Sequence, residues 1–144
     1  MQLDDHYFMR KALEEAELAF AADEVPVGAV IVIDQRIIAR AHNLTERLTD
    51  VTAHAEMQAI TSAANFLGGK YLKGCTLYVT LEPCIMCMGA LYWSQLDRIV
   101  FGADDPKRGA LNGGVRPHPK TKVLGGVMAK EASELLQQFF QKKR

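Results

Sequence analysis

The chain has 144 residues, of which 49% are hydrophobic and 24% are charged, as in an ordinary globular protein with a buried core. Its formal net charge of zero argues against a general electrostatic binder of nucleic acids. Its three cysteines provide no disulfide framework, and we recognise neither a signal peptide nor a membrane-spanning run. We expect a single domain over residues 1–144 that works in the cytoplasm and has no membrane partner.

Hydrophobic patterning predicts helices that alternate with strands. The predicted elements are a helix from Asp4 or Asp5 to about Ala22, strands over 27–33 and 36–41, a helix over 53–65, a strand over 76–80, a helix over 84–94, strands over 98–102 and 122–127, and a helix over 130–142. This order predicts an α/β fold, a three-layer α/β/α sandwich around a five-stranded mixed sheet. The long loop over 103–121 is rich in glycine, proline and charge, which favours a functional role.

The charge is unevenly distributed along the chain. Residues 1–102 carry 8 basic and 13 acidic side chains, whereas residues 103–144 carry 9 basic and 4 acidic ones. Such asymmetry indicates either a local phosphate-binding surface or a solubilising basic tail. Charge alone does not choose between them.

Four residues carry the strongest chemical signal. His54 and the pair Cys84 and Cys87 are zinc-ligand types, and three protein ligands leave the fourth position of the metal open, as in catalytic sites. Zinc lowers the pKa of water toward neutrality, and Glu56 can serve as the general acid and base. The third cysteine, Cys75, has no nearby partners to complete a closed four-ligand site, and we expect it in the core.

The spacing of these residues predicts where each of them lies on its helix. Cys84 and Cys87 stand at i and i+3 of a helix, and we expect Pro83 to lie in its first turn. We expect Thr52 to cap the helix that bears His54, with Ala53 opening it. His54 would then lie in the first turn, and Glu56 would have to curl back toward the metal.

The same residues resemble the signature of the cytidine-deaminase-like superfamily, and the chain is similar to bacterial tRNA-specific adenosine deaminases over almost its whole length. The similarity is carried by Glu24–Val30, Asn43, Thr76–Cys84, Val100–Ala103 with Asp105 and Lys107, and Phe139–Phe140. The zinc motifs identify the superfamily, and the last two segments favour the tRNA enzymes. The chain departs from the family pattern in a shorter loop over 109–123, where Thr121 replaces an Asn-His pair found in many relatives.

This resemblance implies an activity and a set of partners. The activity is hydrolytic deamination of adenosine to inosine at the wobble position of a tRNA anticodon, with the ACG arginine tRNA as the expected substrate. The expected partners are the anticodon stem-loop and a second copy of the chain, since the family forms homodimers whose two subunits both shape each active site. One Zn²⁺ per subunit is expected. The resemblance also implies an opening antiparallel hairpin, with the later strands parallel.

Five further residues are expected to bind the substrate, each with a simpler alternative. Val27 would form an apolar wall for the base, or simply pack in the core, and Asn43 would bind the base, or belong to a turn. Lys107 suits a phosphate and Asp105 a ribose hydroxyl, although both could be solvated loop charges. Phe140 could stack on an unstacked base, or pack inward together with Phe139.

Two other functions remain open from the sequence. A free nucleobase or nucleoside deaminase of the same superfamily, acting on guanine or cytosine, would share the zinc motif without needing the basic C-terminal surface. A zinc-dependent RNA-binding module without turnover would not need the carboxylate of Glu56, which argues against that class.

Overall fold

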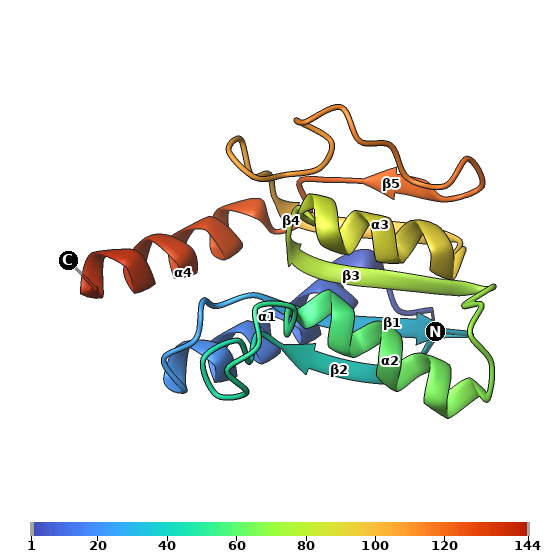
Figure 1. Cartoon of the computed structure of the whole chain (residues 1–144), viewed down its shortest axis with the longest axis horizontal. Helices are drawn as coiled ribbons and strands as arrows, with labels where there is room; N and C mark the ends of the chain where they lie inside the picture. The colour runs from blue at the N-terminus through green and yellow to red at the C-terminus, as the bar shows by residue number, and fades with distance from the viewer. Residues whose placement is uncertain (1, 144) are drawn as a thin grey trace.

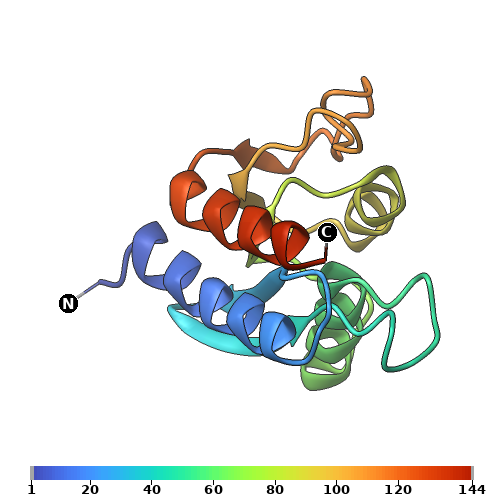
Figure 2. The ribbon, with the colours of Figure 1, turned by 90° about the vertical axis from the view of Figure 1, so that its left-hand side faces the viewer.

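The computed structural model describes residues 2–143 and places one five-stranded sheet between two layers of helices (Figures 1 and 2). The elements are α1 (Asp5–Ala21), β1 (Gly28–Ile33), β2 (Arg36–His42), α2 (Ala55–Leu67), β3 (Cys75–Leu81), α3 (Ile85–Ser94), β4 (Arg98–Ala103), β5 (Lys122–Leu124) and α4 (Ala129–Lys142). Helices α1 and α4 lie side by side on one face of the sheet, and α2 and α3 cover the other. The predicted three-layer sandwich is confirmed.

The strands run in the order β2-β1-β3-β4-β5. Strand β1 is antiparallel to both β2 and β3, whereas β3, β4 and β5 are mutually parallel. This confirms the mixed sheet and the opening antiparallel hairpin. The carboxyl end of β3 and the segment after β4 therefore lie next to each other at the same end of the sheet. In open α/β folds, ligands bind at the carboxyl ends of the strands.

The core has one cluster on each face of the sheet, and the interior strand β1 contributes to both. In β1, Ala29 and Ile31 belong to the cluster beneath α2 and α3, while Val30 and Val32 belong to the cluster beneath α1. A β-branched run with both faces buried is expected of an interior strand that is covered by helices on both sides. Cys75 is fully buried in the first of these clusters, as predicted.

The predicted strand over 122–127 is too long. Strand β5 ends at Leu124 because Gly125 and Gly126 follow, and Gly126 has a φ of +87°. A Cβ on Gly125 would lie 2.3 Å from the ring of Phe101, so the chain needs glycine to pass that ring. Among residues 2–143, no helix is both long and apolar enough to cross a membrane.

Candidate active site

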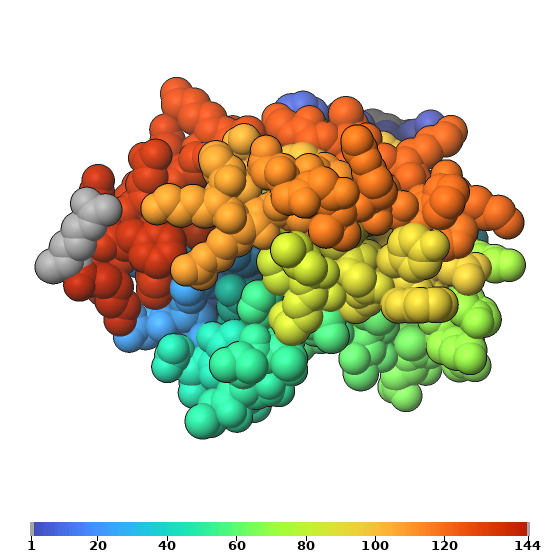
Figure 3. Space-filling view, turned by 45° about the horizontal axis from the view of Figure 1, so that its top comes forward, coloured from blue at the N-terminus to red at the C-terminus, as the bar shows by residue number. Residues whose placement is uncertain are grey.

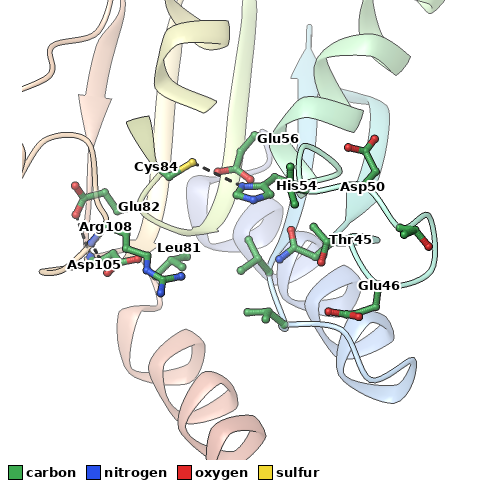
Figure 4. A pocket seen from close by; sticks show the side chains of 15 residues that line it. Thr45, Glu46, Asp50, His54, Glu56, Leu81, Glu82, Cys84, Asp105 and Arg108 are labelled. Carbon is green, nitrogen blue, oxygen red and sulfur yellow. Dashed lines mark hydrogen bonds between the residues drawn. The ribbon is translucent and has the colours of Figure 1, made fainter. Parts of the chain in front are cut away.

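A cavity of about 570 Å³ opens at the carboxyl end of the sheet, between two loops. One wall is the loop over 44–53, which follows β2, and the other is the loop over 104–114, which follows β4. In the space-filling view the two loops face each other across a hollow (Figure 3). His54, Glu56 and Cys84 line the cavity and point toward one another (Figure 4). The chemical residues predicted from spacing therefore meet at one place.

The three predicted ligands converge with the spacing that zinc requires. The Nδ1 atom of His54 lies 3.7 Å from Sγ of Cys84 and 3.5 Å from Sγ of Cys87, and the three ligand atoms lie within 4.8 Å of one another. Zinc–sulfur and zinc–nitrogen bonds of about 2.3 and 2.0 Å at a tetrahedral angle put sulfur and nitrogen roughly 3.6 Å apart. The donor set therefore fits one zinc ion.

The expected cap of α2 is wrong, and the correction explains how His54 reaches the metal. The helix begins at Ala55, not at Ala53, and His54 itself occupies the N-cap position with an extended backbone and no side-chain cap hydrogen bond. The missing acceptor comes from the end of β2, because Asn43 Oδ1 accepts the N–H of Ala55 at 2.9 Å. The imidazole of His54 is thereby free to turn into the cavity.

The start of α3 also differs from expectation. Pro83 lies ahead of the helix instead of in its first turn, because Cys84 is the N-cap residue and the helix begins at Ile85. Cys84 and Cys87 still face the same side, at the N-cap and the third helical position. Unpaired N–H groups and the helix dipole favour negative charge at this end. Cys84, as the N-cap residue, is therefore placed where a thiolate is stabilised.

The ionisation of the ligands follows from their contacts with one another. A hydrogen bond from Cys87, supported by one from His54, lowers the pKa of Cys84 to about 4. The same contact with Cys84, together with burial, raises the pKa of Cys87. The contact with Cys84 also raises the pKa of His54. Of these three groups, Cys84 most readily carries negative charge, and a bound cation would replace the hydrogen bonds that its two neighbours make to that sulfur.

Glu56 lies in the first turn of α2 with only 4% of its surface exposed. Burial raises its pKa to about 7, with the charge on Cys84 adding to the effect. A carboxyl group with a pKa near neutrality can both accept and release a proton. The first turn already carries Glu56 into the cavity, so the predicted curling back is not needed.

The predicted substrate-binding residues do not all reach this cavity. Val27, Asn43 and Asp105 line it, and Val27 also packs in the core. Lys107 is exposed and is not part of the lining, and Phe140 borders a separate hollow on α4. Phe139 is buried and Phe140 is 47% exposed, so the alternative in which both rings pack inward is wrong.

Arg108 lines the cavity and was missed by the sequence reasoning (Figure 4). The carboxylate of Asp105 accepts the N–H groups of Lys107 and Arg108, at 3.2 and 3.1 Å, and closes a tight turn. That turn directs Arg108, not Lys107, toward the cavity. The only sequence signal was the Lys-Arg pair, which does not indicate which of its members faces inward.

Two other residues from the sequence analysis have clear places. Thr121, where the loop departs from the family pattern, is buried and donates its hydroxyl to the carbonyl of Leu96 at 2.7 Å. It therefore anchors the long loop to the segment after α3. Arg144, the last of the basic residues counted over 103–144, lies outside the described residues.

Comparison with known proteins agrees with the fold and the site. The family described as "Cytidine and deoxycytidylate deaminase zinc-binding region" matches residues 2–103. The tRNA-specific adenosine deaminase of Agrobacterium fabrum is 48% identical, over 96% of this chain and 95% of the relative. A solved structure from a study of A-to-I editing by tRNA:A34 deaminases at the wobble position of transfer RNA is 46% identical, covers 90% of this chain and 98% of its own, and has a TM-score of 0.84.

A solved guanine deaminase from Bacillus subtilis is more distant, with 35% identity and a TM-score of 0.68 over 78% of this chain and 69% of that one. The fold and the donor set, with a buried glutamate beside it, are those of a zinc-dependent deaminase. The chain belongs to the family of the tRNA-specific adenosine deaminases, within the cytidine and deoxycytidylate deaminase zinc-binding group.

Proposed function

We propose that this protein hydrolyses the adenine amine of the wobble adenosine in a tRNA anticodon, with the ACG arginine tRNA as substrate and inosine and ammonia as products. The observation that carries the proposal is the buried Glu56 beside His54, Cys84 and Cys87 on the wall of a cavity of about 570 Å³. An anticodon loop splays its bases, so a single adenine can enter such a cavity without the opening of a duplex.

The residues of the chain divide the chemistry between them. Zinc held by His54, Cys84 and Cys87 would act as a Lewis acid and lower the pKa of water. Glu56 takes a proton from the attacking water, whose oxygen bonds to C6 of the adenine. Glu56 delivers this proton to the ring nitrogen. It then takes the second proton from the hydroxyl group now on C6 and passes it to the amine, so that the C6–N bond breaks, ammonia leaves and the C6 carbonyl of inosine forms. Its pKa of about 7 lets it change protonation state within one cycle at neutral pH.

The walls of the cavity support a nucleotide ligand. Asn43 uses Oδ1 to cap α2, so its amide nitrogen, which has no hydrogen-bond partner among the described residues, remains to bind the base. Val27 would form the apolar wall, Asp105 would contact a ribose hydroxyl, and Arg108 adds a cation for a phosphate. Lys107 and Phe140, which lie outside the cavity, would contact flanking nucleotides of the stem-loop.

We also propose that the active species is a homodimer that docks through the outer face of α3. That face carries four partly or largely exposed apolar side chains at helical spacing. They are Ile85 (60% exposed), Met86 (36%), Tyr92 (37%) and Trp93 (73%). An apolar stripe of this kind on a soluble protein marks an interaction surface. Cys84 caps the same helix, so a partner on this face would lie next to the cavity.

We further propose that residues 1–144 form a single catalytic domain that works in the cytoplasm, because its substrate is a tRNA. The test is inosine formation at the wobble position of an unmodified arginine tRNA with an ACG anticodon, using purified, zinc-loaded protein. The matched substrate carries guanosine at that position. Conversion of the adenosine substrate alone is expected. No conversion, together with release of ammonia from guanine or cytosine, would instead establish a free-base deaminase.

A further inference from the structure

Glu82 is a buried carboxylate that the proposed chemistry does not use. It lies directly after β3 and two residues before Cys84, and only 3% of its surface is exposed. Its Oε1 accepts the N–H of Asp105 and the side-chain amide of Asn112, both at 3.0 Å. Its Oε2 accepts the N–H groups of Leu111 and Asn112, at 3.1 and 3.4 Å. Every one of these donors belongs to the 104–114 loop.

No salt bridge to Glu82 is present among residues 2–143. The negative charge is therefore balanced by neutral N–H donors of one loop. Hydrogen bonds to a charged group are worth more than neutral ones, and their loss leaves buried groups unsatisfied. This concentration of acceptors makes Glu82 the main attachment of the 104–114 loop.

The loop is shaped to close around this carboxylate. A Cβ on Gly109 would lie 2.2 Å from Oε2 of Glu82, so no other residue fits there without a rearrangement. Gly109 pairs with Cys84 in an isolated β-bridge, and the N–H of Ala110 donates to the carbonyl of Pro83 at 2.9 Å. The loop is thus joined to the connection between β3 and α3, beside the metal ligands.

The contacts continue from Glu82 to the wall of the cavity. Glu82 fixes the backbone of Asp105, and the Asp105 carboxylate closes the turn that directs Arg108 inward. Figure 4 shows the three residues together on one side of the cavity. We propose that Glu82 is a positioning residue, which holds Asp105 and Arg108 where they meet the RNA, and not a catalytic residue. This inference rests on the proposed function for its substrate.

The test compares Glu82→Gln with Glu24→Gln. Glu24 is also buried, and it accepts the N–H groups of Glu46 and Arg47, at 3.0 and 2.8 Å, on the opposite wall. A glutamine at position 82 keeps the size of the side chain but turns an N–H₂ group toward N–H donors. Asn112→Ala removes only the side-chain amide, and serves as a milder variant if Glu82→Gln does not fold.

Hydrogen exchange of the proteins without RNA gives the first readout. Glu82→Gln should lose protection at Asp105, Leu111 and Asn112 while α2 and α3 keep theirs, and Glu24→Gln should lose protection only over residues 44–53. Unchanged protection of the 104–114 loop in Glu82→Gln overturns the proposal. So does a general loss of protection that includes α3.

Steady-state and single-turnover kinetics on the anticodon stem-loop give the second readout. Glu82→Gln should raise KM about tenfold, equivalent to ~1.4 kcal/mol, while the single-turnover rate at saturating RNA stays within about threefold and the zinc content stays at that of the wild type. A rate loss accompanied by zinc loss would place Glu82 in support of the metal helix instead, and would overturn the assignment. If the wild type converts no RNA, the proposed function fails, while the exchange measurement still decides whether Glu82 holds the loop.

Discussion

Glu56 concentrates the chemistry in a single side chain. We expect Glu56→Ala to lower the single-turnover rate of inosine formation by at least about 10³-fold, because general acid and base steps commonly contribute 10²–10⁴-fold and one residue serves both. Zinc should remain bound, since His54, Cys84 and Cys87 hold it without the carboxylate. Metal analysis beside the kinetic assay checks this. Substantial residual activity in the zinc-loaded variant would refute the assigned role.

Arg108 and Lys107 form a matched pair of cations with different placements. Arg108 lines the cavity and Lys107 does not, so we expect Arg108→Ala to raise KM for the stem-loop about tenfold and Lys107→Ala to raise it less than threefold. Both variants should keep the single-turnover rate at saturating RNA. A larger effect at Lys107 than at Arg108 would show that the turn rearranges when RNA binds.

Whether a site residue could be predicted from the sequence depends on whether neighbouring residues alone determine its role. His54, Glu56, Cys84 and Cys87 were predicted because their residue types and spacing alone specify a zinc-ligand set. The inward direction of Arg108 was not predictable, because the turn that sets it is held by Glu82, which lies 23 residues before Asp105. A contact between distant segments leaves no local pattern in the sequence.

At the scale of the helices, a contact between distant segments also explains why α2 begins two residues later than predicted. The expected cap was a local one, Thr52, whereas the observed acceptor is Asn43, which lies 12 residues before Ala55. The helix types and their order were nonetheless predicted, because the 3.6-residue periodicity of apolar positions is a local property. Helix boundaries depend on capping partners that tertiary structure can supply from elsewhere.

Two substitutions of Asn43 separate its capping from its contact with the base. Asn43→Asp keeps an acceptor for the N–H of Ala55, and a carboxylate also suits a helix N-terminus. We expect it to retain stability and zinc while raising KM, because the amide donor is lost. Asn43→Ala removes both functions and should lower the unfolding free energy by about 1 kcal/mol, with weaker zinc binding as His54 loses its fixed position. Thermal melts and zinc titrations distinguish the two, and equal zinc affinities would contradict the capping role.

Asp5 ties the start of α1 to the sheet and makes this attachment sensitive to acid. Asp5 Oδ2 accepts from Arg98 at 3.0 Å and Oδ1 accepts from the Tyr78 hydroxyl at 2.7 Å. Arg98 holds the pKa of Asp5 below its ordinary value of 3.8. The resulting stability is therefore present above about pH 4 and is lost as the pH falls through the lower, folded-state pKa.

We expect Asp5→Asn to reduce the unfolding free energy by about 1 kcal/mol at pH 7. The difference from the wild type should shrink below pH 4, where the wild-type carboxylate also becomes protonated. Asp23→Asn is the control, because Asp23 pairs with Lys143 on the exposed surface and should contribute less. Denaturant unfolding between pH 3 and pH 7 measures both. A difference that stayed constant with pH would exclude the ion pair as its cause.

At the scale of the whole molecule, the layer of α2 and α3 leaves an apolar surface uncovered in the single chain. One flank of α1 packs against α4, which lies beside it in the same layer, while the outer face of α3 presents Ile85, Met86, Tyr92 and Trp93 to solvent. Burial of apolar area contributes about 25 cal/mol per Å². A second copy docked on this face would remove that area from water and bring another chain to the rim of the cavity.

Trp93 is the most exposed of these four side chains, at 73%, and large aromatic residues commonly dominate binding energy at interfaces. We therefore expect Trp93→Asp to convert a dimer into a folded monomer, because a carboxylate would be buried without a partner at the interface but lies in water in the monomer. Sedimentation at micromolar concentration measures the mass. Leu124→Asp, at an exposed position of the edge strand β5, is the control and should leave the mass unchanged. A wild-type protein that sediments as a monomer would contradict the dimer.

If the dimer brings a second chain to the cavity, Trp93→Asp should also raise KM for the stem-loop while zinc content stays unchanged, since the metal ligands all come from one chain.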